Sequence, residues 1–500
     1  MSKSKIRVGV IGAGVGGLAA AIDLARAGCE VDLFERASEP GGKIRQVGIN
    51  GVDIDAGPTV FTMRWVFEDL FEGAGSKLSE ELNLSRTNIL ARHAWTDGGR
   101  LDLYEDVDES VEAIREFSDE KNADGYKAFC IRSKELYLAL KDTFIAAEKP
   151  SPLGLVSRVG LAPFFGAMWE TSPHRDLWRA LDRYFSDPRL KQLFGRYSTY
   201  VGSSPLATPS ILMLIAHVEQ DGVWLLDGGM HALAKALRNL GENLGVRYHF
   251  NAHVDRINCG QGKVTGLTVG GTEVSGLDAI VFNGDRSALA KGLLGEQVAD
   301  AAPLVKPSRR GLSAIIWCVR ARTSGLPLSY HNVFFAEDYP KEFSHIFHKR
   351  EIVESPTVYV CAQDRLPNKN PDGSERLLIL INAPPDGDTV DITSGREDFY
   401  WNKANTVLKD CGLQLDFDPM DRVMMTPSTF SNLYPGTGGS LYGQASHGIF
   451  SPFLRPGSVS PVEGLFLAGG SVHPGPGVPM ATLSGRLAAR SLLKRFTQKG

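Results

Sequence analysis

The chain opens with short apolar runs that are separated by glycine-rich turns. Residues 6–11 form a β-branched run typical of a buried parallel strand, and residues 18–27 form an alanine-rich run that predicts a helix ended by Gly28. Residues 31–34 predict a second buried strand. This order of strand, turn, helix and strand indicates a parallel α/β unit at the N-terminus.

Alternation of the same kind returns twice further along the chain. A predicted helix over residues 228–240 leads through a strand and a β meander to a buried strand over 279–282, which ends at Asn283. Near the C-terminus, a strand over 464–468 and a glycine-rich turn lead into a helix over 480–496. Basic residues cluster toward the end of that helix, where the helix dipole favours them.

The first turn carries the pattern GxGxxG. Gly12 permits a tight turn, Gly14 lets the backbone approach a pyrophosphate, and Gly17 allows close packing of the helix on the strand. Glu35 directly follows the second strand and is placed to bind ribose hydroxyls, where its carboxylate disfavours a 2′-phosphate. The N-terminal unit is therefore predicted to bind a dinucleotide.

The same N-terminal run also has the outline of a secretory signal, because basic residues precede it. Four glycines interrupt the run, however, which makes that interpretation poor. No uninterrupted apolar run reaches the roughly 18 residues of a membrane-spanning helix.

Composition narrows the classes of partner. The formal net charge is -4, from 54 basic and 58 acidic residues, and this near balance argues against a nucleic-acid partner. The 6 cysteines are scattered without a CxxC pair, so neither a metal site nor a disulfide framework is predicted, and a reducing cytoplasm fits best. A length of 500 residues predicts two or three compact units.

Further motifs carry a family resemblance. Gly41, Gly42 and Lys43 follow Glu35. Three further motifs lie near the C-terminus: residues 440–444 (SLYGQ), 453–456 (FLRP) and 468–486 (AGGSVHPGPGVPMATLSGR). Together with the glycine pattern, they resemble bacterial carotenoid desaturases, which are phytoene desaturase-like FAD oxidoreductases of the amine oxidase superfamily. The C-terminal motif is most similar to the hydroxyneurosporene and methoxyneurosporene desaturases, which are 1-hydroxycarotenoid 3,4-desaturases.

The resemblance implies an α/β fold in which a Rossmann-type FAD-binding domain is interleaved with an α+β substrate domain. The FAD-binding domain would comprise residues 1–75, 225–290 and 455–500, and the substrate domain residues 76–224 and 291–454. The two domains are thus expected to alternate along the chain.

The resemblance also assigns cofactor contacts. Lys43 would lie near the FAD pyrophosphate, the turn at Gly57 and Pro58 would pass beside the flavin, and the Val254 backbone would meet the adenine. The remaining expected FAD contacts are Gly12, Gly14, Gly17, Glu35, Asn283, Gly469, Gly470, Val478 and Met480. From the residues alone, Lys43 could equally be a solvated turn lysine and Val254 an ordinary strand valine.

The expected reaction needs little acid-base machinery. No Ser/His/Asp order, HExxH motif or close carboxylate pair is evident, and hydride removal depends mainly on an acceptor and on correct placement. The implied enzyme removes a hydride and a proton from an acyclic 1-hydroxy or 1-methoxy carotenoid, such as hydroxyneurosporene, to introduce a C3–C4 double bond. No catalytic residue is assigned: His473 is a weak candidate, since a loop histidine before a proline is more often structural, and His217 is expected to be a core histidine.

The sequence contains no second GxGxxG in a strand–turn–helix unit, which argues against a built-in NADPH domain. Electrons from the reduced flavin are therefore expected to pass to oxygen or a quinone.

Residues 151–215 form a possible membrane-contacting region. Within it, residues 151–200 are rich in aromatic and basic residues, and Leu177, Trp178, Leu181 and Phe185 would share one face of a helix. That face could pack on the core or lie in an anionic membrane interface. The expected location is cytoplasmic, with peripheral association to the inner or photosynthetic membrane.

Three alternatives fit the same scaffold: a phytoene desaturase, a noncovalent-FAD amine or porphyrinogen oxidase, and a non-catalytic lipid escort protein. The intact glycines and Glu35 speak against an escort protein without a flavin, and the absence of a cysteine near the C-terminal turn disfavours covalent flavin attachment.

Overall fold

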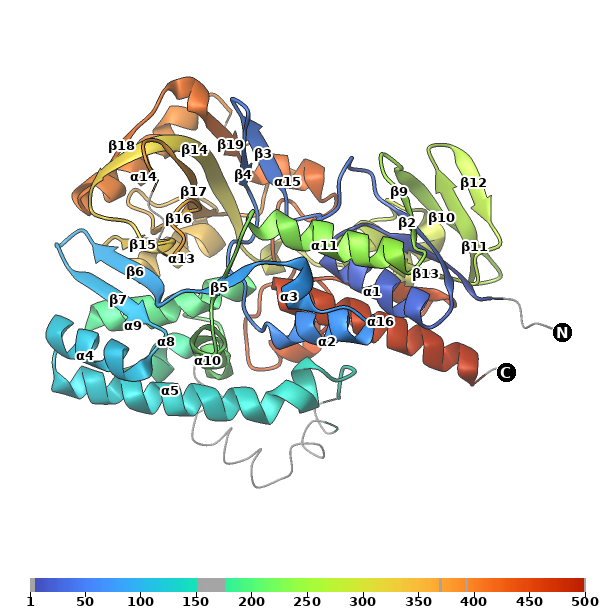
Figure 1. Ribbon diagram of the computed structural model, residues 1–500, viewed down its shortest axis with the longest axis horizontal. Coiled ribbons are helices and arrows are strands. Elements are labelled where there is room, and N and C mark those ends of the chain that lie inside the picture. The colour runs from blue at the N-terminus through green and yellow to red at the C-terminus, as the bar shows by residue number, and fades with distance from the viewer. Residues whose placement is uncertain (1–4, 152–153, 155–175, 368–370, 392–393, 499–500) are drawn as a thin grey trace.

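The computed structural model describes residues 5–151, 154, 176–367, 371–391 and 394–498 (Figure 1). Part of the predicted membrane-contacting region, residues 152–153 and 155–175, therefore lies outside the described residues.

A five-stranded parallel sheet occupies the right half of Figure 1, in the order β20-β13-β1-β2-β9. Its strands are β1 (Arg7–Ile11), β2 (Glu30–Phe34), β9 (Arg247–His249), β13 (Ala279–Phe282) and β20 (Leu465–Leu467). All five strands were expected, four of them from continuous apolar runs, and the sheet brings together strands that lie hundreds of residues apart in the sequence.

The side chains of this sheet alternate between two buried faces. Val8 and Val10 face the helical layer, whereas Ile11 faces a three-stranded meander, so both faces of the central strand are apolar. The helical layer consists of α1 (Val15–Arg26), α11 (Met230–Asn243) and α16 (Val478–Thr497). The meander consists of β10 (Val254–Gly260), β11 (Lys263–Val269) and β12 (Thr272–Ser275).

An eight-stranded mixed sheet forms the second half, in the order β18-β14-β17-β16-β15-β6-β7, with β19 paired to β14. Its strands are β6 (Ile89–Trp95), β7 (Arg100–Tyr104), β14 (Ser313–Gly325), β15 (His331–Phe335), β16 (Val358–Ala362), β17 (Glu375–Ala383), β18 (Leu413–Asp416) and β19 (Arg422–Met425). On β14, Ile315 and Trp317 pack against α14 (Glu397–Asp410), whereas Ile316 and Cys318 lie on the opposite face. The sheet is therefore covered on one face and turns the other inward.

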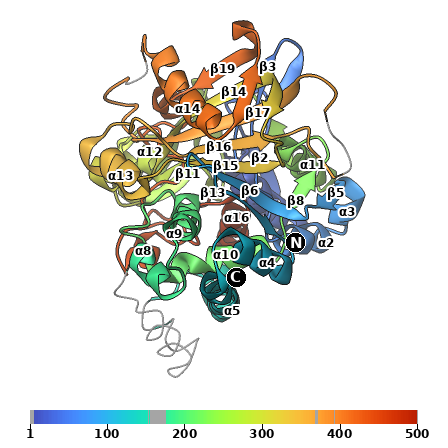
Figure 2. The ribbon, with the colours of Figure 1, turned by 90° about the vertical axis from the view of Figure 1, so that its left-hand side faces the viewer.

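Helices lie below this sheet in the turned view (Figure 2). They are α4 (Val107–Phe117), α5 (Glu120–Leu140), α8 (Leu177–Ala180), α9 (Pro188–Gly195) and α10 (Leu214–Gln220). Among the described residues, the other α-helices and strands are α2 (Trp65–Gly73), α3 (Leu78–Glu81), α12 (Arg286–Ala290), α13 (Tyr339–Ser344), α15 (Pro427–Leu433) and the short strand pairs β3 (Gln46–Ile49) with β4 (Val52–Asp55) and β5 (Leu84–Arg86) with β8 (Trp224–Leu226).

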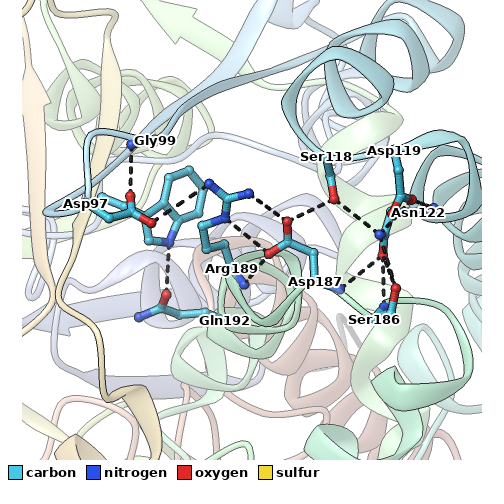
Figure 3. Close-up of polar contacts among 10 residues, drawn as sticks. Asp97, Gly99, Ser118, Asp119, Asn122, Ser186, Asp187, Arg189 and Gln192 are labelled. Atoms are coloured by element: carbon cyan, nitrogen blue, oxygen red, sulfur yellow. Dashed lines mark hydrogen bonds and ion pairs between the residues drawn. The ribbon is translucent and has the colours of Figure 1, made fainter.

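A buried asparagine ties two of these helices together (Figure 3). The Asn122 side chain is 1% exposed, and its oxygen accepts hydrogen bonds from the backbone amides of Ser186 at 2.9 Å and Asp187 at 3.3 Å. Its amide group donates to Asp119 at 2.9 Å. Because Asp119 caps α5 and Asp187 caps α9, one side chain fixes the start of both helices.

The same network reaches the sheet through α9. Arg189 pairs with Asp187 at 2.8 Å and lies 3.9 Å from Asp97, in the turn between β6 and β7 (Figure 3). Gln192 accepts a hydrogen bond from the Trp95 indole at 2.9 Å. Polar side chains thus fasten the helical layer to the edge of the eight-stranded sheet.

The segment around residues 177–185 corrects one expectation. It forms α8 and a separate 3₁₀ turn, η2 (Leu181–Arg183), and does not continue as one amphipathic helix. Leu177, Leu181 and Phe185 are buried, so the core-facing interpretation is right for these side chains. No helix of the described chain is long and apolar enough to cross a membrane.

Candidate active site

A cavity of about 840 Å³ lies between the two halves. Its nucleotide end is built by residues that follow the carboxyl ends of parallel strands: Gly12 after β1, Glu35 after β2, Asn283 after β13 and Gly469 after β20. The crevice beyond the carboxyl ends of such strands is where open α/β sheets bind ligands.

The glycine-rich turn is shaped by close backbone contacts. A Cβ atom at Gly17 would lie 2.0 Å from the Gly12 carbonyl oxygen, so Gly17 faces the turn and does not line the cavity. A Cβ at Gly57 would lie 1.9 Å from the Lys43 carbonyl oxygen. Gly41 forms an isolated bridge with Gly14 and has a φ of 123°, which favours glycine. The cradle leaves no room for side chains at these positions.

Two helices begin at this cradle. α1 starts after Gly14 and α16 starts after Gly477, and residues of both first turns line the cavity. The helices are in contact, because a Cβ at Gly485 would lie 1.9 Å from the Gly16 carbonyl oxygen. First-turn amides have no acceptor within their own helix and carry the positive end of the dipole. Two such ends converging on one cavity suit an anionic ligand.

Glu35 supports the turn as well as lining the cavity. Its carboxylate accepts hydrogen bonds from the backbone amides of Ala13 at 2.7 Å and Ala37 at 2.8 Å. The carboxylate therefore helps to hold the glycine turn, a role that the ribose assignment had not included.

Lys43 is not a solvated turn lysine. Its ammonium group donates to the Leu441 carbonyl oxygen at 2.6 Å and lies 5.2 Å from the centre of the Tyr434 ring. Burial lowers the pKa of Lys43, an effect that Asp285 opposes and Arg455 reinforces. The site thus holds a cationic side chain inside the cavity wall.

The other predicted cofactor residues also meet at this cavity. Asn283 donates its side-chain amide to the Gly12 carbonyl oxygen at 3.3 Å and so links β13 to the glycine turn. Apart from Gly17, all the predicted contacts line the cavity: Gly12, Gly14, Glu35, Lys43, Gly57, Pro58, Val254, Asn283, Gly469, Gly470, Val478 and Met480.

The two candidate histidines lie elsewhere. His473 is 1% exposed, is not among the cavity-lining residues, and packs edge-on against Phe144, with its Nε2 atom 3.0 Å from the Ala147 carbonyl oxygen. His217 is half-buried against Tyr137, and burial lowers its pKa.

Arg455, in the FLRP motif, lines the cavity and was not among the predicted site residues. Its buried guanidinium donates to the carbonyl oxygens of Gln444 at 2.7 Å and Gly470 at 3.1 Å. Burial, with the nearby charge of Arg286, lowers the pKa of Arg455 to about 10. The arginine holds the SLYGQ motif against the C-terminal glycine turn, which explains why these motifs occur together.

Beyond the cradle the cavity continues as an apolar channel. One wall is helical, with Leu140 and Ile215, and the facing wall is the inward face of the eight-stranded sheet, with Ile316 and Leu380. The lining also includes polar side chains that sequence reasoning missed, among them Thr59, Arg196, Tyr200 and Tyr359. No motif in the sequence marks these four residues.

A family model described as flavin containing amine oxidoreductase matches residues 15–493. The chain belongs to this family. Its fold agrees with that of solved members: putrescine oxidase bound to putrescine matches with a TM-score of 0.61 at 14% identity, covering 99% of both chains. At that identity the likeness concerns the fold alone.

Two curated relatives of this flavin oxidoreductase are similar over nearly their whole length. Hydroxyneurosporene desaturase of Rubrivivax gelatinosus is 48% identical over 97% of this chain and 93% of the relative. The 1-hydroxycarotenoid 3,4-desaturase of Flavobacterium sp. is 31% identical over 96% of this chain and 97% of the relative.

The cavity fits the flavin nucleotide that the family requires. The cradle excludes side chains at Gly17 and Gly57, two helix N-termini supply amides for a pyrophosphate, and Glu35 lies at the end of β2 beside the cavity.

Proposed function

We propose that the protein is an FAD-dependent carotenoid desaturase that introduces a C3–C4 double bond into an acyclic 1-hydroxy or 1-methoxy carotenoid. The observation that carries the proposal is the continuity of the cavity, which runs from the glycine cradle into an apolar channel. A long apolar substrate in that channel would reach the cofactor without leaving its apolar surroundings. The names of the two curated relatives support the same substrate class.

FAD would be held along the cradle. Gly12, Gly14 and the first turn of α1 would bind its pyrophosphate, with Lys43 nearby, while Glu35 would bind the ribose hydroxyls and Val254 the adenine. Gly57, Pro58, Gly469, Gly470, Val478 and Met480 would surround the flavin, and Asn283 and Gly17 would hold the turn in shape. When bound, the flavin accepts the hydride that leaves the substrate.

The protein itself positions the substrate and keeps water away from the reacting carbons. The substrate loses a hydride from one carbon and a proton from its neighbour, and the channel walls hold this C–C bond against the cofactor while excluding water. Phe144 lines the cavity and packs on His473, which does not line it. We therefore expect the proton acceptor to be a group that lines the channel, and not His473. Oxygen or a quinone would then take the two electrons.

We further propose that residues 1–75, 225–290 and 455–500 form the FAD-binding domain and the remaining segments the substrate domain. All five strands of the parallel sheet come from those three segments.

The test is product formation by FAD-loaded protein. Incubation with hydroxyneurosporene in liposomes should give a product with red-shifted absorption, because one more double bond joins the conjugated system. Protein stripped of FAD serves as the control and should give no product. A loaded protein that leaves hydroxyneurosporene unchanged, or that instead produces peroxide from amines, would contradict the proposal.

Exposed apolar side chains lie where the channel opens at Ile449 and Phe450, and they favour peripheral contact with a membrane. Ile449 and Phe450 line the cavity and are 36% and 64% exposed, and Leu454, next to the lining residue Phe453, is 45% exposed. Leu206 lies beside them, since the next residue, Ala207, accepts a backbone hydrogen bond from Gly448. We propose that this rim dips into the membrane interface, so that a water-insoluble carotenoid enters the channel directly from lipid.

Vesicle binding tests the rim. The double variant Phe450→Ser, Leu454→Ser should co-sediment with anionic liposomes much more weakly than the unchanged protein. Phe399 and Met420 are exposed apolar residues at α14 and beside β19, away from the mouth, so Phe399→Ser with Met420→Ser is the matched control. Equal loss in both variants, or in neither, would count against the rim as the contact.

A further inference from the structure

Four polar side chains of the channel contact one another and are called the polar cluster here: Thr59, Arg196, Tyr200 and Tyr359. They come from the loop after Pro58, from the 3₁₀ turn η3 (Arg196–Val201) and from β16. The surrounding walls are largely aliphatic and aromatic, and a polar group in such surroundings needs a partner. The polar cluster is therefore expected to face a polar atom of the ligand.

A hydrogen-bond chain connects the cluster to a buried histidine. Thr59 Oγ1 lies 2.7 Å from Tyr359 Oη, which in turn lies 2.7 Å from His331 Nδ1. His331 Nε2 has no hydrogen-bond partner within the described chain. Burial lowers the pKa of His331 to about 3, so the ring is neutral and carries one proton.

The position of that proton sets the direction of the chain. A buried N–H without an acceptor is rarer in proteins than a lone pair without a donor, which places the proton on Nδ1. His331 then donates to Tyr359, and the Tyr359 hydroxyl donates to Thr59. The Thr59 hydroxyl hydrogen is left uncommitted in a residue that lines the channel.

Arg196 adds further donors. Its guanidinium lies 5.4 Å from the centre of the Tyr200 ring and 5.7 Å from that of Tyr359, in cation–π contacts. Among the described residues Arg196 forms no ion pair with a carboxylate, although the charge of the nearby Glu219 acts on it. Both oxygens of Glu219 are taken by the hydroxyls of Tyr197 and Tyr200. Arg196 and Thr59 together present N–H and O–H donors to the channel.

The cluster lies where the cofactor cradle meets the channel. Thr59 follows Gly57 and Pro58 directly, and Gly57 packs against the Lys43 backbone. In a 1-oxygenated carotenoid that is oxidised at C3 and C4, only C2 separates the oxygen-bearing carbon from the first reacting carbon. Groups that bind this oxygen must therefore lie at the cofactor end of the channel, as the cluster does.

We propose that the polar cluster binds the oxygen atom on C1 of the substrate and thereby selects oxygenated over unoxygenated carotenoids. This inference rests on the proposed function. Donors from Thr59 and Arg196 would serve a hydroxyl and a methoxy oxygen alike, since both are acceptors. An unoxygenated polyene would leave the donors unpaired, which a site built for hydrogen bonding strongly disfavours.

The test compares kcat/KM for a 1-hydroxylated polyene with that for an unoxygenated polyene of equal length. In Thr59→Val the ratio of the two values should fall about tenfold, mainly through the hydroxylated substrate. Tyr359→Phe should lower it less, and Thr59→Ser should restore it. Equilibrium binding of both polyenes, followed by quenching of protein fluorescence, should show the same order.

Tyr339→Phe is the matched control, because Tyr339 also lines the channel but its hydroxyl has no hydrogen bond to any described residue. An unchanged ratio in Thr59→Val protein that retains FAD, or an equal fall in Tyr339→Phe, would overturn the inference. Failure of the unchanged protein to convert any carotenoid would instead contradict the proposed function.

Discussion

The two halves of the molecule are held together by different interactions. In the nucleotide half, backbone meets backbone: Gly17 against Gly12, Gly57 against Lys43 and Gly485 against Gly16. In the channel half, side chains such as Asn122 carry the connections between elements. A backbone contact tolerates one residue type, whereas a side-chain network can be rebuilt in several ways. Short sequence motifs therefore identify the cofactor site, whereas no such motif identifies the channel.

The largest effect is expected from Gly17→Ala in the nucleotide half. The new methyl carbon would lie 2.0 Å from the Gly12 carbonyl oxygen, so the turn or helix α1 must shift. We expect loss of nearly all bound flavin, measured by absorption after gel filtration, and a loss of stability of about 1–3 kcal/mol. Gly48→Ala is the control, because its nearest atom would be an ordinary 3.5 Å away. Retention of flavin by Gly17→Ala would show that the turn is softer than its contacts indicate.

Asn122→Ala, in the channel half, should lower stability without loss of flavin. The substitution leaves the partly buried backbone amides of Ser186 and Asp187 without their acceptor and should lower the free energy of unfolding by about 1–3 kcal/mol. Flavin content should not change, because Asn122 is not among the residues lining the cavity. Urea unfolding followed by circular dichroism measures the loss, and Lys121→Ala, at the exposed neighbouring position, should be close to neutral. Loss of flavin would mean that the halves are more tightly coupled than proposed.

Glu35→Gln tests whether the carboxylate supports the turn. An amide side chain cannot accept from both Ala13 and Ala37, so one backbone hydrogen bond and its charge assistance are lost. FAD affinity should fall about tenfold, as measured by isothermal titration of apoprotein. Glu30→Gln at the start of the same strand should bind FAD normally. Equal affinities in the two variants would indicate that Glu35 is dispensable.

The smallest effect concerns pH and falls in the channel half. Burial, with the charge of Arg196, lowers the pKa of His93 to about 3, so this ring stays neutral in the folded protein. The unfolded chain takes up a proton below about pH 6.5, so stability rises with pH in this window and is lost as the pH falls.

One such histidine contributes a slope of at most about 1.4 kcal/mol per pH unit, or about 1 kcal/mol between pH 6.5 and 5.5. His93→Asn, which keeps a donor for the Leu101 carbonyl, should flatten that slope. His253→Asn is the control, because that side chain is 63% exposed. Parallel slopes for all three proteins, from urea unfolding at several pH values, would contradict the assignment.

The difference between the halves also explains what the sequence could predict. The strands at residues 7–11, 30–34, 279–282 and 465–467 were expected, because a buried parallel strand is a continuous apolar run. The family and its flavin followed from the glycine pattern and the C-terminal motif.

The channel was not predictable in the same way. Tyr359 and Thr59 are 300 positions apart and meet only because strand β16 faces the loop after Pro58. The apolar face of residues 177–185 was ambiguous for a related reason: helical spacing shows that Leu177 and Leu181 share a face, but only the packing shows what covers it.

The contact between α1 and α16 has a consequence for biosynthesis. A ribosome makes β1 and α1 among the first elements and β20 and α16 last, yet the first turns of both helices line the same cofactor cavity. The complete cavity can therefore form only after residues 465–497 have emerged from the ribosome. A chain that stops before α16 would lack the cavity wall that Val478 and Met480 supply.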